Sequence, residues 1–185
     1  MRTKPAVNPR KAAFAPVVNA DTRVLILGSL PGAMSLAAAQ YYANPRNRFW
    51  QLVGEVIARP DLPVLHYKQQ LAVLLANGIG LWDAVASAER PGSLDSAIRK
   101  AQPAALADLI AALPQLRVVA FNGQTSGKIA RPLLSSMALA LIDLPSSSPA
   151  HAALSLVQKR QMWLGLRQFV ERPLPCAANG GIENP

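Results

Sequence analysis

Residues 22–32, TRVLILGSLPG, run from an apolar, β-branched stretch directly into a turn that contains two glycines. A continuous apolar run of this length that ends at a glycine turn is typical of a parallel strand buried on both faces. We therefore predict a strand here, with a loop at its carboxyl end.

Three later segments repeat this pattern of apolar run and polar or glycine-containing loop: GIGLWDAV (78–85), RVVAFNG (117–123) and LALIDLPSSSPAHA (139–152). Helical patterns separate them, so the chain alternates strand, loop and helix. This alternation predicts an α/β fold, a three-layer sandwich in which a central four-stranded parallel sheet is flanked by helices.

The spacing of apolar residues predicts the helices at about 47–58, 67–76, 94–112, 124–134 and 151–171. Within 94–112, Pro103 marks the start of a second helix. The last segment, 151–171, reads as one long amphipathic helix with a basic outer face. No internal repeat is visible in the sequence.

The domain organisation follows from composition. We expect a flexible basic arm over residues 1–20, a single domain over 21–172 and a flexible tail over 173–185. The basic, proline-broken N-terminus does not read as a secretory signal, and no apolar run is long enough for a spanning helix. We expect a monomeric, cytoplasmic protein that does not bind a membrane.

The net charge of +9 and the pI of about 10.5 favour a polyanionic partner, and they also fit an anionic membrane surface. Cys176 is the one cysteine, and His66 and His151 do not show metal-ligand spacing. We therefore expect chemistry without a metal or any other cofactor.

Functional residues of an open parallel sheet gather beyond the carboxyl ends of its strands. Four loops should meet there: GSLPG (28–32), WDAVASAERPG (82–92), NGQTSG (122–127) and LPSSSPAHA (144–152). One alternative reading assembles Ser29, His151 and Asp143 as the triad of a serine ester or amide hydrolase. Against it, GSLPG lacks the G-x-S-x-G spacing of a nucleophile elbow.

Residues 41–50, YYANPRNRFW, hold four of the ten aromatic side chains, together with two asparagines and two arginines. Aromatic faces stack bases, amides orient water or pair with base edges, and arginines hold phosphates. Phe49 and Trp50 begin the apolar helical pattern and should be core. Asn47 stands where a helix N-cap would stand, so a purely structural role is open as well.

Together, LILGSLPG, YYANPRNRFW and LPSSSPAHA resemble motifs of the uracil-DNA glycosylase superfamily, most of all its hypoxanthine (deoxyinosine) DNA glycosylase branch, which is related to the mismatch-specific uracil/thymine enzymes. The resemblance runs from about Arg23 to Val170. It implies a monofunctional DNA glycosylase of base-excision repair, which flips a deaminated base out of DNA and hydrolyses its N-glycosidic bond without a cofactor. Hypoxanthine is the expected base, with uracil and xanthine as further candidates.

The resemblance also implies roles for individual residues. Other branches carry a water-activating Asp or Asn where this chain has Ser29 or Leu30, and the hypoxanthine branch shares that substitution. Asn47 then matches the catalytic asparagine, with Ser29 beside it. Tyr42 matches the ring on which the flipped base stacks. The expected base pocket further includes Gly28, Leu30, Asn122 and Asp83, whose carboxylate could accept the N1–H of hypoxanthine or could instead cap a helix.

The same resemblance gives the DNA-binding residues. Ser147 and Ser148 match phosphate-binding serines, and the loop through Pro149, Ala150 and His151 would enter the groove. Candidates for a basic DNA-facing surface are Arg46, Arg48, Lys128, Arg131, Lys159, Arg160 and Arg167. Because the motif-one acid is missing, a catalytically weak nucleic-acid-binding module of the same fold is the alternative to an active enzyme.

Overall fold

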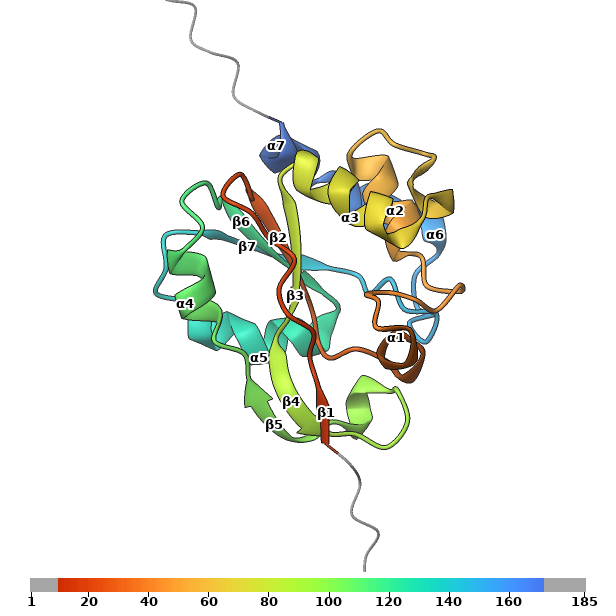
Figure 1. Ribbon diagram of the computed structural model, residues 1–185, viewed down its shortest axis with the longest axis vertical. Coiled ribbons are helices and arrows are strands. Elements are labelled where there is room, and N and C mark those ends of the chain that lie inside the picture. Colours follow the sequence, from red (N-terminus) through yellow and green to blue (C-terminus); the bar gives the residue numbers. More distant parts are fainter. Residues whose placement is uncertain (1–9, 172–185) are drawn as a thin grey trace, which may run out of the picture.

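A computed structural model describes residues 10–171 of the chain. Its centre is a four-stranded parallel sheet in the order β3-β2-β6-β7 (Figure 1). The strands are β2 (Val24–Gly28), β3 (Ile79–Asp83), β6 (Val118–Asn122) and β7 (Ala140–Leu144). All four predicted strands are therefore confirmed, as is the predicted fold class.

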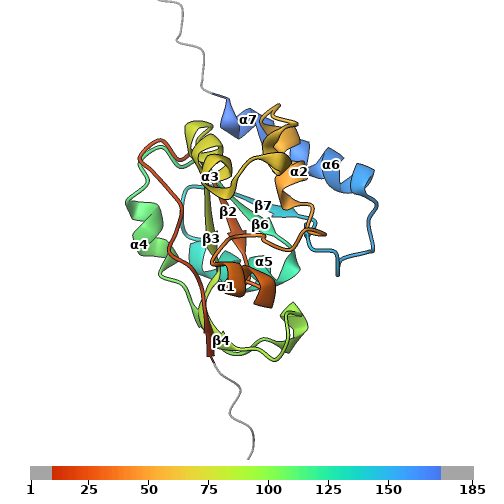
Figure 2. The same cartoon turned by 45° about the vertical axis from the view of Figure 1, so that its right-hand side comes forward.

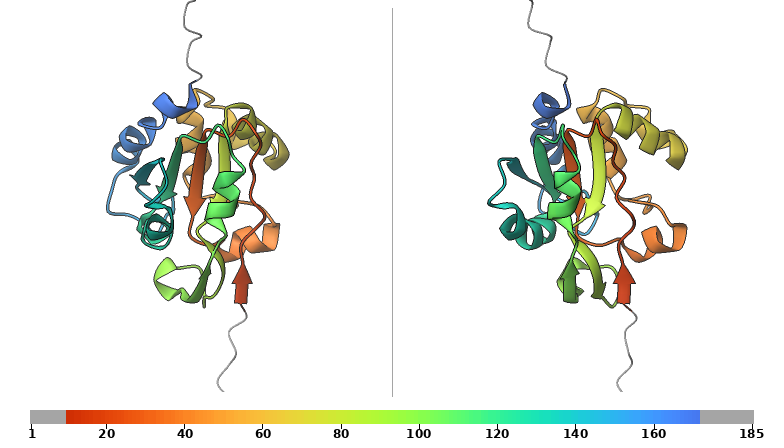
Figure 3. Two further views of the ribbon diagram at one scale, coloured as in Figure 1. Left: turned by 90° about the vertical axis from the view of Figure 1, so that its left-hand side faces the viewer. Right: turned by 60° about the vertical axis from the view of Figure 1, so that its left-hand side comes forward.

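Successive side chains of β2 point to opposite faces of the sheet and build two cores. Val24 and Ile26 pack against α2 (Phe49–Val56), α3 (Tyr67–Ala76), α6 (Leu156–Leu164) and α7 (Arg167–Val170). Leu25 and Leu27 pack against α4 (Leu106–Ala111), which lies over the sheet in Figure 3, and α5 (Gln124–Leu134). Burial of each such side chain contributes about 1.5–3 kcal/mol, so the sheet is fixed from both sides.

A small antiparallel sheet, which the sequence patterns did not predict, has the order β1-β4-β5. Its strands are β1 (Arg10–Ala12), β4 (Val85–Glu89) and β5 (Arg99–Pro103), with the short helix η2 (Asp95–Ala97) before β5. The predicted helix over 94–112 is therefore wrong up to residue 105. Backbone pairing of β5 with β4 outweighs the helical preference of this alanine-, lysine- and arginine-containing segment.

The expectation of a flexible arm over residues 1–20 is wrong for its second half. β1 pairs with β4, and the N–H and carbonyl of Val17 both bind Leu81 at 2.9 Å. The ring of Phe14 packs edge-on against Tyr41 with a centroid distance of 5.1 Å. Residues 1–9 and the expected tail over 173–185, with Cys176, lie outside the described residues.

The last predicted helix is also shorter than expected. Residues 151–154 are loop, and α6 begins after Ser155, whose hydroxyl accepts the backbone N–H of Gln158 in a capping box. A break at Gly165 separates α6 from α7. Two elements complete the order, α1 (Ala33–Ala38), which lies beyond the carboxyl end of β2 (Figure 2), and η1 (Leu62–Val64). Over residues 10–171, none of the helices could cross a membrane.

Candidate active site

A cavity of about 350 Å³ lies at the carboxyl ends of the parallel strands. The strands are in register, with Gly28 opposite Asp83 and Asn122 opposite Leu144, so their exit loops meet at one edge. The cavity brings together most of the site residues expected from the sequence: Gly28, Ser29, Leu30, Tyr42, Asn47, Asp83, Asn122, Ser147, Ser148, Pro149 and His151. Arg46, Arg48 and Lys128 are exposed and are not among its lining residues.

Tyr42 forms an aromatic wall of the cavity in a fixed orientation. Its ring stacks on Phe49 with a centroid distance of 3.7 Å and an interplanar angle of 9°. Its hydroxyl accepts a hydrogen bond from Nδ2 of Asn122 at 3.2 Å. The backbone has φ +54°, a strained value for a residue with a side chain, which costs about 1–2 kcal/mol. Stacking and the hydrogen bond hold the residue there, and burial raises the pKa of its phenol.

Asn47 is half-buried at the end of a tight turn that begins at Asn44. The side-chain oxygen of Asn44 accepts the N–H of Arg46 at 3.0 Å, and its carbonyl accepts the N–H of Asn47 at 2.8 Å. Oδ1 of Asn47 accepts the N–H of Phe49, the first residue of α2, at 2.9 Å. The N-cap of α2 is Arg48, so Asn47 is not the N-cap residue considered from the sequence, although its side chain binds the first helical N–H. Asn47 lines the cavity, and its Nδ2 group can donate hydrogen bonds.

Asp83 is a buried carboxylate of the cavity, with 3% of its surface exposed. Over residues 10–171, its Oδ2 atom has no hydrogen-bond partner. Burial raises the pKa of Asp83 to about 7; the positive charge of Arg90 opposes this shift and the negative charge of Asp95 adds to it. The alternative that Asp83 caps a helix is wrong, because β4 begins two residues later.

The absence of a side chain on Gly28 leaves the space that the carboxyl group of Asp83 occupies. A Cβ atom on Gly28 would lie 2.7 Å from Oδ1 of Asp83 and 3.4 Å from the hydroxyl of Tyr42. Any larger residue would displace the carboxylate, so the glycine serves the packing of the site.

Asn122 and Ser147 form a buried hydrogen-bond network that ties the third strand-end loop to the fourth. Oδ1 of Asn122 accepts the N–H of Ser147 at 2.9 Å, and Nδ2 donates to the Ser147 hydroxyl at 2.9 Å. Ser147 is 1% exposed, and its expected contact with a phosphate stays a prediction. The Nδ2 group of Asn122 has both hydrogens engaged, here and on Tyr42, so it holds Tyr42 and Ser147 in position, and the expected base contact of Asn122 stays a prediction.

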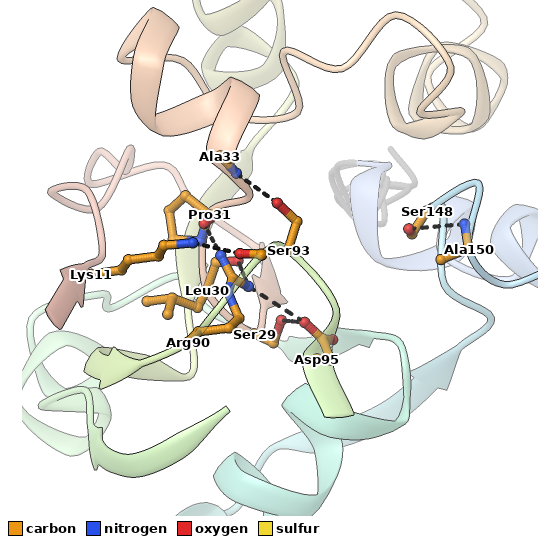
Figure 4. Close-up of polar contacts among 11 residues, drawn as sticks. Lys11, Ser29, Leu30, Pro31, Ala33, Arg90, Ser93, Asp95, Ser148 and Ala150 are labelled. Atoms are coloured by element: carbon orange, nitrogen blue, oxygen red, sulfur yellow. Dashed lines mark hydrogen bonds and ion pairs between the residues drawn. The ribbon is translucent and has the colours of Figure 1, made fainter. Parts of the chain in front are cut away.

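The rest of the fourth loop is also held from within the protein. Ser148 is half-buried, and its hydroxyl accepts the N–H of Ala150 at 3.3 Å (Figure 4). Lys159 donates to the carbonyl of His151 at 2.7 Å and is only 5% exposed. Lys159 therefore supports the loop and does not belong to a basic surface.

Three further basic candidates bind protein groups as well. Arg131 pairs with Asp143 at 2.7 Å, Arg160 pairs with Glu55, and Arg167 donates to the carbonyl of Glu55 at 2.8 Å. Arg46, Arg48 and Lys128 remain as exposed candidates for contacts with DNA phosphates.

The hydrolase triad considered from the sequence is not assembled. The hydroxyl of Ser29 donates to Asp95 at 2.7 Å and has no contact with His151. Asp143 pairs with Arg131, is 70% exposed in its side chain and does not line the cavity. The reading as a serine ester or amide hydrolase is therefore wrong in its geometry.

Sequence reasoning expected the loop over residues 82–92 at this edge but singled out neither Arg90 nor Asp95, both of which contact the first loop (Figure 4). Arg90 is 1% exposed and donates to the carbonyls of Leu30, at 2.9 Å, and Pro31. Its guanidinium also lies 3.7 Å from Asp95. Because residues 94–112 read as a helix, nothing in the local pattern placed Asp95 in the site.

The described residues do not form a metal site. Over residues 10–171, no group of three or more His, Cys, Asp or Glu side chains could hold a metal ion. The polar groups of the cavity are instead side-chain amides, hydroxyls, the imidazole of His151 and the carboxyl groups of Asp83 and Asp95.

A parallel sheet with a cavity at its carboxyl edge, walled by a tyrosine ring and lined by amide and carboxyl groups, defines an α/β protein with the fold of the uracil-DNA glycosylases. The family model described as the uracil DNA glycosylase superfamily matches residues 15–167, and the chain belongs to this superfamily. The resemblance seen in the sequence is confirmed, and the match supports the predicted enzyme class, a DNA glycosylase.

Similar proteins also carry the names of DNA glycosylases. A Methanosarcina barkeri (strain Fusaro / DSM 804) protein named hypoxanthine DNA glycosylase is 38% identical over 154 residues, which cover 83% of this chain and 96% of that protein. A Methanosarcina acetivorans protein of the same name is 41% identical over 145 residues, covering 78% and 90%. The solution NMR structure of an M. acetivorans protein described as a candidate uracil DNA glycosylase superposes with a TM-score of 0.79 at 37% identity, covering 88% of this chain and 100% of that one.

Proposed function

We propose that this DNA glycosylase removes hypoxanthine from DNA by hydrolysis of the N-glycosidic bond, with uracil and xanthine as further candidate bases. The observation that carries the proposal is the convergence of Tyr42, Asn47 and Asp83 on one cavity of about 350 Å³. Two relatives named hypoxanthine DNA glycosylase support the choice of base. The finer expectations, a monomer that acts in the cytoplasm, stay predictions.

The base must leave the duplex to enter this cavity, because its glycosidic bond is shielded within the base stack. Tyr42 offers a flat surface for the extruded base, and such stacking is worth about 1–3 kcal/mol per base. Arg46, Arg48 and Lys128 would contact phosphates on the exposed surface around the site. The net charge of +9 favours the approach of the polyanion.

Asp83 would read the edge of the base. Hypoxanthine presents a hydrogen-bond donor at N1–H beside an acceptor at O6. A protonated Asp83 matches both, since its O–H donates and its second oxygen accepts. A pKa of about 7 keeps this form populated near neutral pH. The neutral form also avoids repulsion as negative charge develops on the departing base.

Asn47 would act on the sugar side or the base side through its Nδ2 group. Its Oδ1 atom is already bound to the N–H of Phe49, so the amide has a fixed direction. An amide donates hydrogen bonds but does not accept a proton at neutral pH. In this proposal Asn47 positions the water or the leaving base and leaves proton transfer to another group.

The test is a panel of duplex oligonucleotides that each contain one inosine, uracil or xanthine, incubated with the protein and then cleaved with alkali at any abasic site. We expect strand cleavage at inosine. Asn47→Ala should lose most of this activity while it retains DNA binding, and Asn19→Ala, an exposed asparagine outside the cavity, should behave as wild type. If none of the three bases leads to strand cleavage, the proposal is wrong.

The alternative of a binding module without catalysis rests on Ser29, which stands where other branches of the superfamily carry an Asp or Asn. It predicts salt-sensitive binding of DNA without release of a base. The same panel separates the two functions, because only the enzyme generates alkali-labile sites.

A further inference from the structure

Hydrolysis of a glycosidic bond needs a group that receives a proton from the attacking water, and this need directs attention to the carboxyl groups of the cavity. The inference drawn here rests on the proposed glycosylase function. Asn47 supplies an amide, which is not a base. Asp83 is only 3% exposed and is assigned to the base edge. Asp95 is the other carboxylate among the lining residues.

Asp95 reaches the site from a segment far from the first loop in the sequence. Its Oδ1 atom accepts the hydroxyl proton of Ser29 at 2.7 Å, across 66 residues of sequence (Figure 4). Its side chain is 41% exposed. Within the described residues, the contacts of its carboxylate with Ser29 and Arg90 are made at Oδ1 and not at Oδ2. One carboxylate oxygen is thus anchored and the other is free to bind a water molecule.

The position of this carboxylate is fixed by buried groups. Arg90 lies 3.7 Å from Oδ1 of Asp95 and binds the carbonyls of Leu30 and Pro31. The carbonyl of Ser29 accepts the N–H of Val85 at 3.1 Å, which fixes the serine backbone. The charge of Asp95 also contributes to raising the pKa of Asp83, so its field extends to the buried part of the cavity.

Ser29 occupies one of the two places that the superfamily resemblance gives to the water-activating Asp or Asn. Because its only hydroxyl proton goes to Asp95, the oxygen of Ser29 presents lone pairs to other groups. A water molecule bound there could donate one hydrogen to Ser29 and the other to Oδ2 of Asp95. Serine and aspartate together would then provide what a single acid provides elsewhere.

We propose that Asp95, with Ser29 as the positioning residue, is the base that activates the attacking water. The water oxygen forms a bond to C1′ of the sugar while the bond from C1′ to the base nitrogen breaks, and its electron pair leaves with the base. One water proton passes to Oδ2 of Asp95 and later to solvent, and the anionic base takes a proton from solvent. The negative carboxylate also stabilises the positive charge that develops on the sugar.

The alternative role for Asp95 is structural, a partner that merely holds Arg90 and Ser29. Asp95→Asn separates the two roles, because its side-chain oxygen can still accept the Ser29 hydroxyl while charge and basicity are lost. We expect the single-turnover rate of hypoxanthine excision to fall about 100- to 10,000-fold. Affinity for a duplex with an uncleavable abasic-site analogue and the Tm should stay unchanged. Ser29→Ala should lose less, on the order of 10-fold.

The matched control is Asp61→Asn, an aspartate paired with Arg59 at 2.7 Å outside the cavity, which should excise at the wild-type rate. If Asp95→Asn lowers the Tm, Asp95→Ala assayed with added formate decides: restoration by formate supports the proposal, and no restoration overturns it. A rate for Asp95→Asn within threefold of wild type also overturns the role of Asp95 and leaves the glycosylase function intact. A wild-type protein that excises no base of the panel overturns both.

Discussion

Replacing Asp83 with Asn should change how the stability of the protein depends on pH. Burial raises the pKa of this carboxyl from 3.8 to about 7, so between these values the folded protein holds a proton that the unfolded chain releases. The contribution to stability is complete below about pH 4 and is lost as the pH rises to about 7. At about 1.4 kcal/mol per pKa unit, three units give roughly 4 kcal/mol.

The measurement is urea denaturation of wild type and Asp83→Asn at intervals from pH 4 to pH 8. The free energy of unfolding of wild type, relative to the variant, should fall by about 4 kcal/mol across this range and level off above pH 7. Asp61→Asn serves as the control: its hydrogen bond with Arg59 lowers the pKa of Asp61 below the ordinary 3.8, so its difference from wild type should stay nearly constant from pH 4 to pH 8. A difference between wild type and Asp83→Asn that stays constant with pH would refute the assigned protonation state.

Three further predictions concern the walls of the cavity. Tyr42→Ala should raise the KM for an inosine duplex by about 5- to 100-fold through loss of stacking, and an unchanged KM would contradict its role as platform. Asn122→Ala leaves the N–H and hydroxyl of Ser147 buried without partners, so the free energy of unfolding should drop by about 2–5 kcal/mol; a drop below about 1 kcal/mol in urea denaturation speaks against the network. Gly28→Ala places a Cβ atom 2.7 Å from the buried carboxyl oxygen and should slow excision at least about 10-fold, which a single-turnover assay would detect.

The sequence predicted the sheet well because its signal is local. β2 is buried at every position, and a strand covered on both faces must be apolar throughout, so it can be read from five residues. Strand direction then placed Gly28, Asp83, Asn122 and the fourth loop at one edge. For this reason most of the candidate site could be assembled before any contact was known.

The small antiparallel sheet could not be predicted in the same way. Arg99–Pro103 is exposed at all five positions and carries no apolar alternation, so its strand exists only because β4 pairs with it. β1 is likewise a short, polar strand whose partner lies more than 70 residues away. The sequence pattern predicted a helix for the segment of β5 and a flexible arm for the segment of β1. Both are strands because they pair with β4, which is distant from β1 in the sequence.

Site residues that are held through long-range contacts were also beyond the sequence patterns. The motif of Ser147 predicted a phosphate contact but gave no sign of its buried hydrogen bonds with Asn122. Asp95 gave no signal, because its contact with Ser29 depends on the fold of the segment after β4. Such residues are found by asking which buried donors and acceptors satisfy one another.

Arg90 explains how a carboxylate from a remote segment can be placed accurately enough for chemistry. A buried guanidinium is costly unless it is paired, and over residues 10–171 its Nε atom still has no partner. Its remaining donors bind the carbonyls of Leu30 and Pro31 while its charge faces Asp95. One side chain thus fixes both the loop that carries Ser29 and the acid that Ser29 binds. Because Arg90 binds the loop of Ser29 and also faces Asp95, it ties the two segments together, so the first motif can lack an acid of its own.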